Sequence, residues 1–203
     1  MSLGKFFAIE GGDGAGKTTF VNELKAACPQ FVYSREPGGK GMSHLVRMLV
    51  LSEDARTSDP LTMFHLFWAS RAENFASVIL PALKEGKTVI SDRFDASTYA
   101  FQIGEHPHLE DLFWETRKVC LQGVEPVYLN FEVSIQKARS RMDRRGGQNH
   151  FDLRADEYRQ RVRLQYHKFF GNPTVKSVRI DADLPKDQMI SRGMGALEKA
   201  LSL

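Results

Sequence analysis

Residues 11–18 read Gly-Gly-Asp-Gly-Ala-Gly-Lys-Thr, and this stretch decides the fold. It matches the phosphate-binding P-loop pattern G-x-x-x-x-G-K-[ST]. The apolar run 6–10 before it predicts a buried strand and the pattern 18–27 after it predicts a helix, which is the context that the motif requires. A plain glycine turn has no use for Lys17 and Thr18 at these two positions. The stretch therefore predicts binding of a nucleoside triphosphate together with Mg²⁺.

Each part of this loop has an expected role. The glycines let the backbone wrap around a phosphate, so that successive N–H groups and the helix N-terminus point at anionic oxygens. Lys17 adds a positive charge near the β- and γ-phosphates, and Thr18 offers its hydroxyl to Mg²⁺. The predicted triphosphate-binding residues are Gly11, Gly12, Asp13, Gly14, Ala15, Gly16, Lys17, Thr18 and Thr19.

The composition is that of an ordinary folded protein. The chain has 203 residues, 42% of them hydrophobic and 26% charged, which predicts one domain over residues 1–203. The net charge of +3 does not indicate a nucleic-acid partner. Cys28 and Cys120 match no zinc spacing. Because no apolar run approaches the ~20 residues needed to cross a bilayer, and residues 1–5 lack signal-peptide features, we expect no membrane partner and a cytoplasmic location.

Beyond the P-loop, predicted strands and helices alternate along the chain. Such alternation requires a parallel sheet covered on both faces, so we predict an α/β protein with a five-stranded parallel sheet. Ligands should gather at the carboxyl ends of its strands. The further predicted strands are 31–34, 88–91, 127–131 and 177–181, and the further predicted helices are 43–51, 60–83, 97–101, 109–121, 135–141, 154–170 and 185–201.

Two interruptions of this pattern carry specific expectations. Asp59 should cap the long helix with Pro60 in its first turn, and Pro81 should kink or end that helix. Residues 143–149 (DRRGGQN) are too polar and glycine-rich for a core element and predict a loop. We expect this loop to form a short lid over about 141–152.

The rest of the chain narrows the class of P-loop protein. The guanine-reading NKxD pattern of GTPases is absent, and the DxxG match at 143–146 falls in the polar loop. A chain of 203 residues has no room for the additional domains of a motor. A small kinase is therefore the favoured class.

At this point the chain resembles the thymidylate kinases along almost its entire length. The likeness lies in four segments that have the family's order and spacing: 7–19 (FAIEGGDGAGKTT), 34–39 (SREPGG), 59–73 (DPLTMFHLFWASRAE) and 89–102 (VISDRFDASTYAFQ). The resemblance implies the P-loop NTPase fold in a nucleoside monophosphate kinase domain, and phosphorylation of dTMP by ATP to give dTDP. It also implies a homodimer, for which the helix 64–75 is a candidate surface.

Asp92 and Arg93 follow a predicted strand at the edge where substrates should lie. Asp92 can hold Mg²⁺, and Arg93 can bind the acceptor phosphate in line for attack. The alternative is a weak surface ion pair between them. Arg35 is a second candidate for the acceptor phosphate, for which a solvated loop arginine is the alternative.

The resemblance implies an acceptor site for dTMP. It aligns Phe67 with the residue that stacks on the base, and Arg71 with the residue that donates to a base carbonyl. Phe101, which stands where many family members have Tyr, would exclude a ribose 2′-hydroxyl. The implied dTMP-binding residues are Asp13, Arg35, Glu36, Pro37, Phe67, Arg71, Arg93, Thr98, Phe101 and Gln102.

The P-loop has no arginine, because small residues occupy positions 14 and 15, and the transferring phosphoryl group needs a further cation. The arginine cluster 139–145 leads into the lid and is its expected source. We favour Arg145, then Arg141 and Arg144. No general base is required, since the attacking phosphate oxygen is already anionic. The predicted catalytic residues are Lys17, Arg93, Arg145, Arg141 and Arg144, and the predicted metal ligands are Thr18 and Asp92.

Two other readings of the sequence remain. The nearer rival is a P-loop kinase for another nucleoside or nucleotide, because one methyl group distinguishes dTMP from dUMP by only ~1–3 kcal/mol. The second is a nucleotide-binding module without catalysis. Its mark would be loss of Lys17, Asp92 or Arg93, and all three are present.

Overall fold

The computed structural model describes residues 3–145 and 156–202, with Arg145 described in its backbone alone. Its centre is a five-stranded sheet in the order β2-β3-β1-β4-β5, in which each adjacent pair of strands is parallel. The predicted α/β architecture is therefore confirmed. The strands are β1 (Phe6–Glu10), β2 (Val32–Arg35), β3 (Val89–Asp92), β4 (Val127–Glu132) and β5 (Lys176–Asp181).

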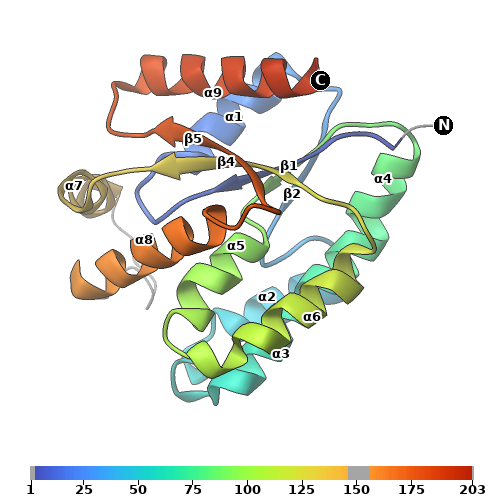
Figure 1. Cartoon of the computed structure of the whole chain (residues 1–203), viewed down its shortest axis with the longest axis vertical. Helices are drawn as coiled ribbons and strands as arrows, with labels where there is room; N and C mark the ends of the chain where they lie inside the picture. The colour runs from blue at the N-terminus through green and yellow to red at the C-terminus, as the bar shows by residue number, and fades with distance from the viewer. Residues whose placement is uncertain (1–2, 146–155, 203) are drawn as a thin grey trace.

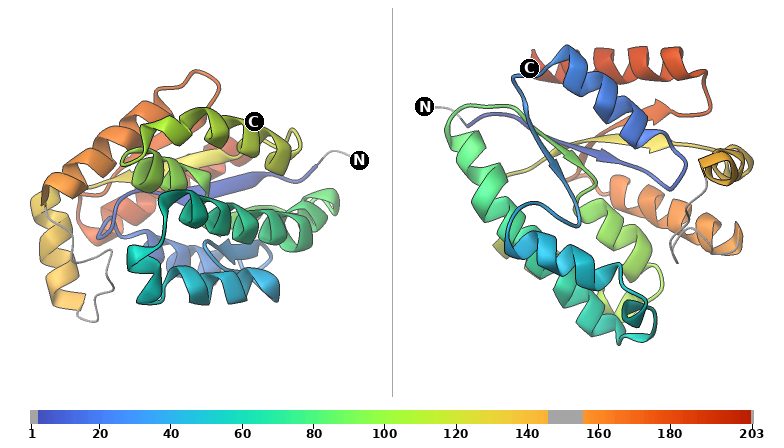
Figure 2. Two further views of the ribbon diagram at one scale, coloured as in Figure 1. Left: turned by 90° about the horizontal axis from the view of Figure 1, so that it is seen from below. Right: turned by 180° about the vertical axis from the view of Figure 1, so that it is seen from behind.

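Helices cover both faces of the sheet (Figures 1 and 2). On one face lie α1 (Lys17–Ala27) and α9 (Lys186–Leu201), whereas the larger group of helices lies on the other. No helix in the described ranges is long and apolar enough to cross a membrane. The remaining helices are α2 (Met42–Val50), α3 (Pro60–Asn74), α4 (Leu80–Lys84), α5 (Asp95–Thr98), α6 (Glu110–Leu121), α7 (Ile135–Arg145) and α8 (Asp156–Phe170).

The central strand β1 anchors both layers. Every residue of β1 is buried, and successive side chains of a strand point to opposite faces. Phe7 and Ile9 belong to the apolar cluster formed with α1 and α9, whereas Phe6 and Ala8 belong to the cluster under the other helices. Because burying one phenylalanine contributes about 1.5–3 kcal/mol, Phe6 and Phe7 each stabilise the layer of helices that they contact.

The long helical segment after Asp59 departs from a regular α-helix. The Asp59 carboxylate accepts hydrogen bonds from the N–H groups of Leu61 and Thr62, at 2.9 and 3.2 Å, as a cap should. A π-helical turn, Phe75–Ile79, then connects α3 to α4. Of the two predicted effects of Pro81, an end to the helix is wrong, since α4 continues to Lys84, whereas the regular α-helix is interrupted by the π-helical turn just before this proline. Pro81 lies in the first turn of α4, where the missing N–H costs least.

Two further boundaries differ from the sequence prediction. Residues 143–145 were predicted to be loop, but α7 continues through them. An exposed helix needs no apolar residues on its outer face, so the polar composition did not exclude helix here. The helix predicted over 97–101 begins earlier, as α5, and ends in a second π-helical turn, Tyr99–Ile103. Short 3₁₀ turns occur at Asp54–Thr57 and Pro107–Leu109.

Candidate functional site

A cavity of about 760 Å³ lies at the carboxyl ends of β1, β2 and β3. Its wall is formed by the P-loop, the segment after β2, α2 with the 3₁₀ turn that follows it, α3, the segment after β3, α7 and α9. Because the three strands are parallel, the connections that follow them meet at this edge. The cavity therefore brings together segments that are distant in the sequence.

The backbone of the P-loop depends on glycine at two positions. Gly11 and Gly14 have φ angles of 138° and 77°, in the region that side chains disfavour. A Cβ atom at Gly11 would lie 2.2 Å from the carbonyl oxygen of Phe131, and one at Gly14 would lie 2.6 Å from that of Ala138. The loop can follow this path only without side chains at these positions.

Lys17 is the buried cation of this loop. Its side chain is buried, and its Nζ donates to the carbonyl oxygens of Gly11 and Gly12, each at 2.7 Å. Burial, and after it the nearby charge of Arg93, lower the pKa of Lys17 to about 8, against the opposing charge of Asp13. A phosphate at the loop would replace the two carbonyls as partner and stabilise the charged form.

Arg93 and Asp92, at the end of β3, do not pair with each other. The guanidinium of Arg93 forms an ion pair with the carboxylate of Asp13 in the P-loop. Asp92 instead faces Arg35, with 3.7 Å between Oδ2 and Nε. The alternative of a surface ion pair between Asp92 and Arg93 is therefore wrong, and both residues line the cavity. Arg93 has a φ of 69°, which is uncommon for a residue with a side chain.

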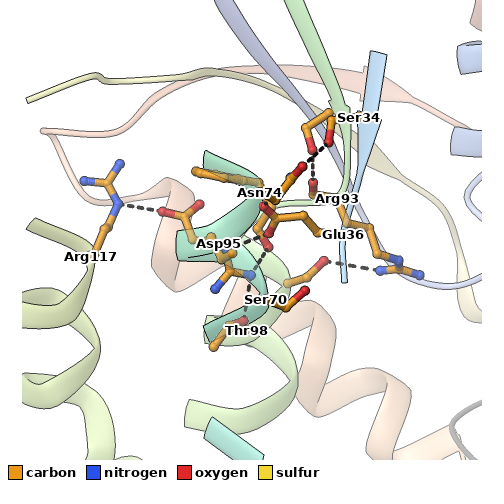
Figure 3. A network of polar contacts seen from close by, with 12 residues as sticks. Ser34, Glu36, Ser70, Asn74, Arg93, Asp95, Thr98 and Arg117 are labelled. Carbon is orange, nitrogen blue, oxygen red and sulfur yellow. Dashed lines mark hydrogen bonds and ion pairs between the residues drawn. The ribbon is translucent and has the colours of Figure 1, made fainter. Parts of the chain in front are cut away.

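A buried ion pair lies deeper in the cavity wall. Arg71 Nε donates to Glu36 Oε2 at 2.7 Å, and Asn74 Nδ2 donates to the other oxygen at 3.2 Å (Figure 3). Burial raises the pKa of Glu36 to about 7, although the charge of Arg71 opposes this. Glu36 therefore orients Arg71, a role that the sequence did not suggest.

Of the two remaining nitrogens of Arg71, one is hydrogen-bonded to the protein and one is not. Nη2 donates to the carbonyl oxygen of Phe94 at 3.1 Å and to Thr98 Oγ1 at 3.0 Å. Nη1 is buried and has no hydrogen-bond partner within the described ranges. Gln102 Oε1 is in the same situation. A buried polar group without a partner is costly, so these two atoms mark a place where a polar ligand would be stabilised.

Most of the predicted site residues meet at this one cavity. Gly11 and Gly12 do not line it; their carbonyls instead hold Lys17. Phe67 lies one helical turn from Arg71 on α3, as its spacing predicted. The predicted residues that line the cavity are Asp13, Gly14, Ala15, Gly16, Lys17, Thr18, Thr19, Arg35, Glu36, Pro37, Phe67, Arg71, Asp92, Arg93, Thr98, Phe101, Gln102 and Arg141.

The arginines predicted to belong to the lid make different contacts. Arg141 lines the cavity and donates to the carbonyl oxygen of Gly14 at 3.1 Å. Arg144 is exposed, and its Nε donates to the carbonyl oxygen of Ser140 in its own helix at 3.1 Å. The side chain of Arg145 and residues 146–152 of the predicted lid lie outside the described part of the chain.

The sequence reasoning missed Arg47, which also lines the cavity. Its Nη1 donates to the carbonyl oxygen of Pro37, and burial together with the charge of Arg35 lowers its pKa. The available signal was a single charge within the otherwise apolar run 45–51. It also missed Glu10 and Tyr166, which lie behind Arg93 and outside the large cavity.

Thr18 and Asp92 present suitable chemistry for Mg²⁺. A hydroxyl and a carboxylate are oxygen ligands of the kind that this ion prefers, and both residues line the cavity. The ion usually takes only one or two protein ligands and completes its shell with water and substrate phosphates. The residues present fit that pattern.

Comparisons with known proteins agree with one another. The thymidylate kinase family model matches residues 9–192. The thymidylate kinase of Mesoplasma florum is 35% identical over 190 residues, covering 91% of this chain and 90% of that protein. That of Leuconostoc citreum is 32% identical over 210 residues, covering 100% and 98%, and that of Limosilactobacillus reuteri is 31% identical over 196 residues, covering 92% of each. With the P-loop, the buried arginine and the cavity that joins them, these matches establish that the chain belongs to the thymidylate kinase family.

Proposed function

We propose that this protein is a dTMP kinase, which transfers the γ-phosphoryl group of ATP to dTMP and gives dTDP and ADP. The observation that carries this proposal is the continuity of the cavity. It joins the P-loop around Lys17 to the pocket around Phe67 and Arg71, with Arg93 lining it as well. A cavity with a triphosphate site and a separate polar pocket suits a reaction between two substrates. We also propose that residues 1–203 act as one kinase domain.

The donor half of the site is the P-loop. Backbone N–H groups of this loop would bind the β- and γ-phosphates of ATP, and Lys17 would turn from its loop carbonyls to the phosphate oxygens. Thr18 and Asp92 would hold Mg²⁺, which when bound neutralises charge on the phosphates. Thr18 is an exposed residue and lines the cavity, which supports this assignment.

The acceptor half is the part of the cavity that Phe67, Arg71 and Arg93 line. Phe67 would stack on the thymine ring, and the unpartnered Nη1 of Arg71 would donate to a base carbonyl. Arg35 and Arg93 would bind the acceptor phosphate. In our proposal Asp13 contacts the deoxyribose 3′-hydroxyl while it also holds Arg93.

In the reaction, an oxygen of the dTMP phosphate attacks the γ-phosphorus, and the bond from that phosphorus to the bridging oxygen of ADP breaks. The attacking oxygen is anionic, so these side chains need only position the groups and neutralise charge. Arg93 orients the acceptor, while Lys17 stabilises charge on the donor. A lid arginine would supply the remaining cation. The sequence favours Arg145 for this role, and the contact of Arg141 with the P-loop supports Arg141.

A coupled assay of ADP release tests the proposal. Purified protein would be given ATP and Mg²⁺ with dTMP, dUMP, dCMP, dGMP or thymidine as acceptor. We expect dTMP to give the highest kcat/KM, with dUMP nearest to it because the two differ by one methyl group. Faster turnover of another acceptor would overturn the substrate. Binding of ATP and dTMP without formation of dTDP would instead indicate a module that has lost catalysis.

We further propose a homodimer, although not through the helix region first suggested. Phe64, Trp68 and Phe75 are buried in the core of the chain itself, so they are not free to make a subunit interface. The exposed apolar side chains of α2 support a different surface, the α2 face, formed by Met42, Leu45, Met48 and Leu49. The cytoplasmic location and the lack of nucleic-acid and membrane partners stay predictions.

A further inference from the structure

A buried carboxylate lies directly behind Arg93. Glu10 ends β1 and has no exposed surface. Its Oε1 accepts from the N–H groups of Phe94 and Ser97, at 2.6 and 3.1 Å. Its Oε2 accepts from the hydroxyls of Ser97 and Tyr166, at 2.7 and 3.1 Å. A carboxylate offers about four acceptor positions, so this set of donors satisfies it.

Tyr166 connects this carboxylate to a distant helix. It lies on α8 and is 3% exposed. Its hydroxyl is 3.0 Å from Ser97 Oγ and 3.3 Å from the carbonyl oxygen of Gly11, in addition to its contact with Glu10. Its ring contacts Phe101 edge to face, with 6.2 Å between the ring centroids. One hydroxyl therefore links α8, the start of the P-loop and α5.

These contacts act on both the backbone and the side chain of Arg93. Because Arg93 has a φ of 69°, its conformation must be held by its surroundings. Glu10 fixes the next peptide through the N–H of Phe94. Ser97 Oγ, which donates to Glu10, accepts from Arg93 Nη1 at 3.3 Å. The chain of contacts thus runs from Tyr166 through Glu10 and Ser97 to the guanidinium.

Neither Glu10 nor Tyr166 lines the large cavity, so neither is placed to touch a substrate there. We infer that Glu10 and Tyr166 are positioning residues, which act through Ser97 to hold the Arg93 guanidinium in the orientation that binds the acceptor phosphate. This inference rests on the proposed function, because it assigns to Arg93 the phosphate of dTMP.

Calorimetric binding of two acceptors separates this role from a general structural one. In Tyr166→Phe only the hydroxyl is lost, and we expect dTMP to bind roughly tenfold more weakly, the effect of one hydrogen bond to a charged group. Thymidine lacks the phosphate that Arg93 would bind. Tyr166→Phe should therefore bind thymidine within about twofold of the wild-type affinity, because the lost hydrogen bond acts only through Arg93. Tyr33→Phe is the matched control, since its hydroxyl donates to the carbonyl oxygens of Leu24 and Cys28.

A double-mutant cycle asks whether the effect passes through Arg93. In an Arg93→Ala background, adding Tyr166→Phe should change dTMP affinity by less than about twofold, because the group being positioned is absent. Glu10→Gln is tested in the same way: alone it should weaken dTMP binding, and in the Arg93→Ala background it should change dTMP affinity by less than about twofold. Thermal unfolding of each variant identifies any that fails to fold. If Tyr166→Phe or Glu10→Gln does not fold, the inference is judged on the other of these two variants.

Several results would overturn the inference. Tyr166→Phe could weaken dTMP and thymidine binding equally, or weaken dTMP binding just as much in the Arg93→Ala background. It could also leave dTMP affinity as unchanged as Tyr33→Phe does. Each of these results would assign Glu10 and Tyr166 to folding alone. A wild-type protein that does not bind and phosphorylate dTMP would overturn the proposed function instead. The wild-type measurement therefore distinguishes the two failures.

Discussion

Arg141 donates a hydrogen bond from Nη1 to the backbone carbonyl of Gly14, at 3.1 Å, although the two residues lie 127 positions apart in the chain. Nη2 of the same side chain donates to the carbonyl oxygen of Ala182 at 2.8 Å. The planar guanidinium thus joins α7 to the P-loop and to the segment after β5. A cation from α7 is brought to a loop whose own sequence lacks arginine.

Lid arginines can be compared directly by substitution. We expect Arg141→Ala to lower kcat by a factor on the order of 10³ with a smaller change in ATP affinity, because a cation on the transferring phosphoryl group acts in the transition state. Arg144→Ala is the matched control and should stay near wild type, since Arg144 bonds to its own helix. Arg145→Ala, measured alongside, tests the preference drawn from the sequence. Equal losses in Arg141→Ala and Arg144→Ala would contradict this assignment.

Lys17 should take up a proton when ATP binds at alkaline pH. Its pKa is about 8 in the free protein, so above this pH the side chain is increasingly neutral, whereas bound phosphates favour the charged form. ATP affinity should therefore fall as pH rises above 8. Calorimetry of ATP binding at pH 9, in two buffers of different ionisation enthalpy, measures the number of protons that the protein takes up. Lys17→Arg, which stays charged, should show none, and equal uptake in both proteins would exclude Lys17 as its source.

The Arg71–Glu36 pair makes a prediction about stability. Arg71→Met leaves Glu36 buried without its cation and should lower the free energy of unfolding by about 3–5 kcal/mol. Adding Glu36→Gln should recover part of this loss. Urea unfolding measures both, and a double variant no more stable than Arg71→Met would show that the unpaired charge is not the cause.

The same variant has an expected pH dependence. Burial raises the pKa of Glu36 in the folded state, so the folded protein binds a proton at a pH where the unfolded chain does not. Stability from this group therefore falls as pH rises through that window. The deficit of Arg71→Met should be larger at pH 8 than at pH 5. A deficit independent of pH would mean that lost packing dominates.

The α2 face can be tested with one charge. Met48 is 61% exposed, and Met48→Glu should convert a dimer to a monomer in light scattering, because burying an unpaired carboxylate opposes association. Leu164→Glu places the same charge on α8, at a residue 60% exposed, and should leave the mass unchanged. A dimer that persists in Met48→Glu would exclude this surface.

The local parts of the fold were predictable from sequence because their causes are local. The apolar run 6–10 and the glycine-rich loop after it are patterns over a few neighbouring positions, and together they predicted the first strand, the P-loop and the helix that follows. The start of α3 at Asp59 was likewise predictable from its cap. The extent of α7 was not, because polar composition describes an exposed helix as well as a loop.

The site was predictable as a set of residues but not as a set of contacts. Resemblance to the family singled out Arg71, Arg93 and Asp13. It did not reveal that Arg93 pairs with Asp13 rather than Asp92, since these partners are brought together only by the sheet. Glu10 looked like the last residue of an ordinary strand, and its partner Tyr166 lies 156 positions away. Such contacts leave no periodic signal in a single sequence.

The π-helical turn Tyr99–Ile103, which carries Phe101 and Gln102, holds one more residue than an α-helical turn would over the same rise. Removing one residue from it would restore a regular α-helical turn and shift the side chains within the turn, while the helix on either side keeps its phase. The segment could still fold, yet Phe101 and Gln102 would no longer both face the acceptor pocket. A deletion of one position here, which sequence comparison treats as minor, would therefore reshape this part of the cavity while leaving the rest of the fold intact.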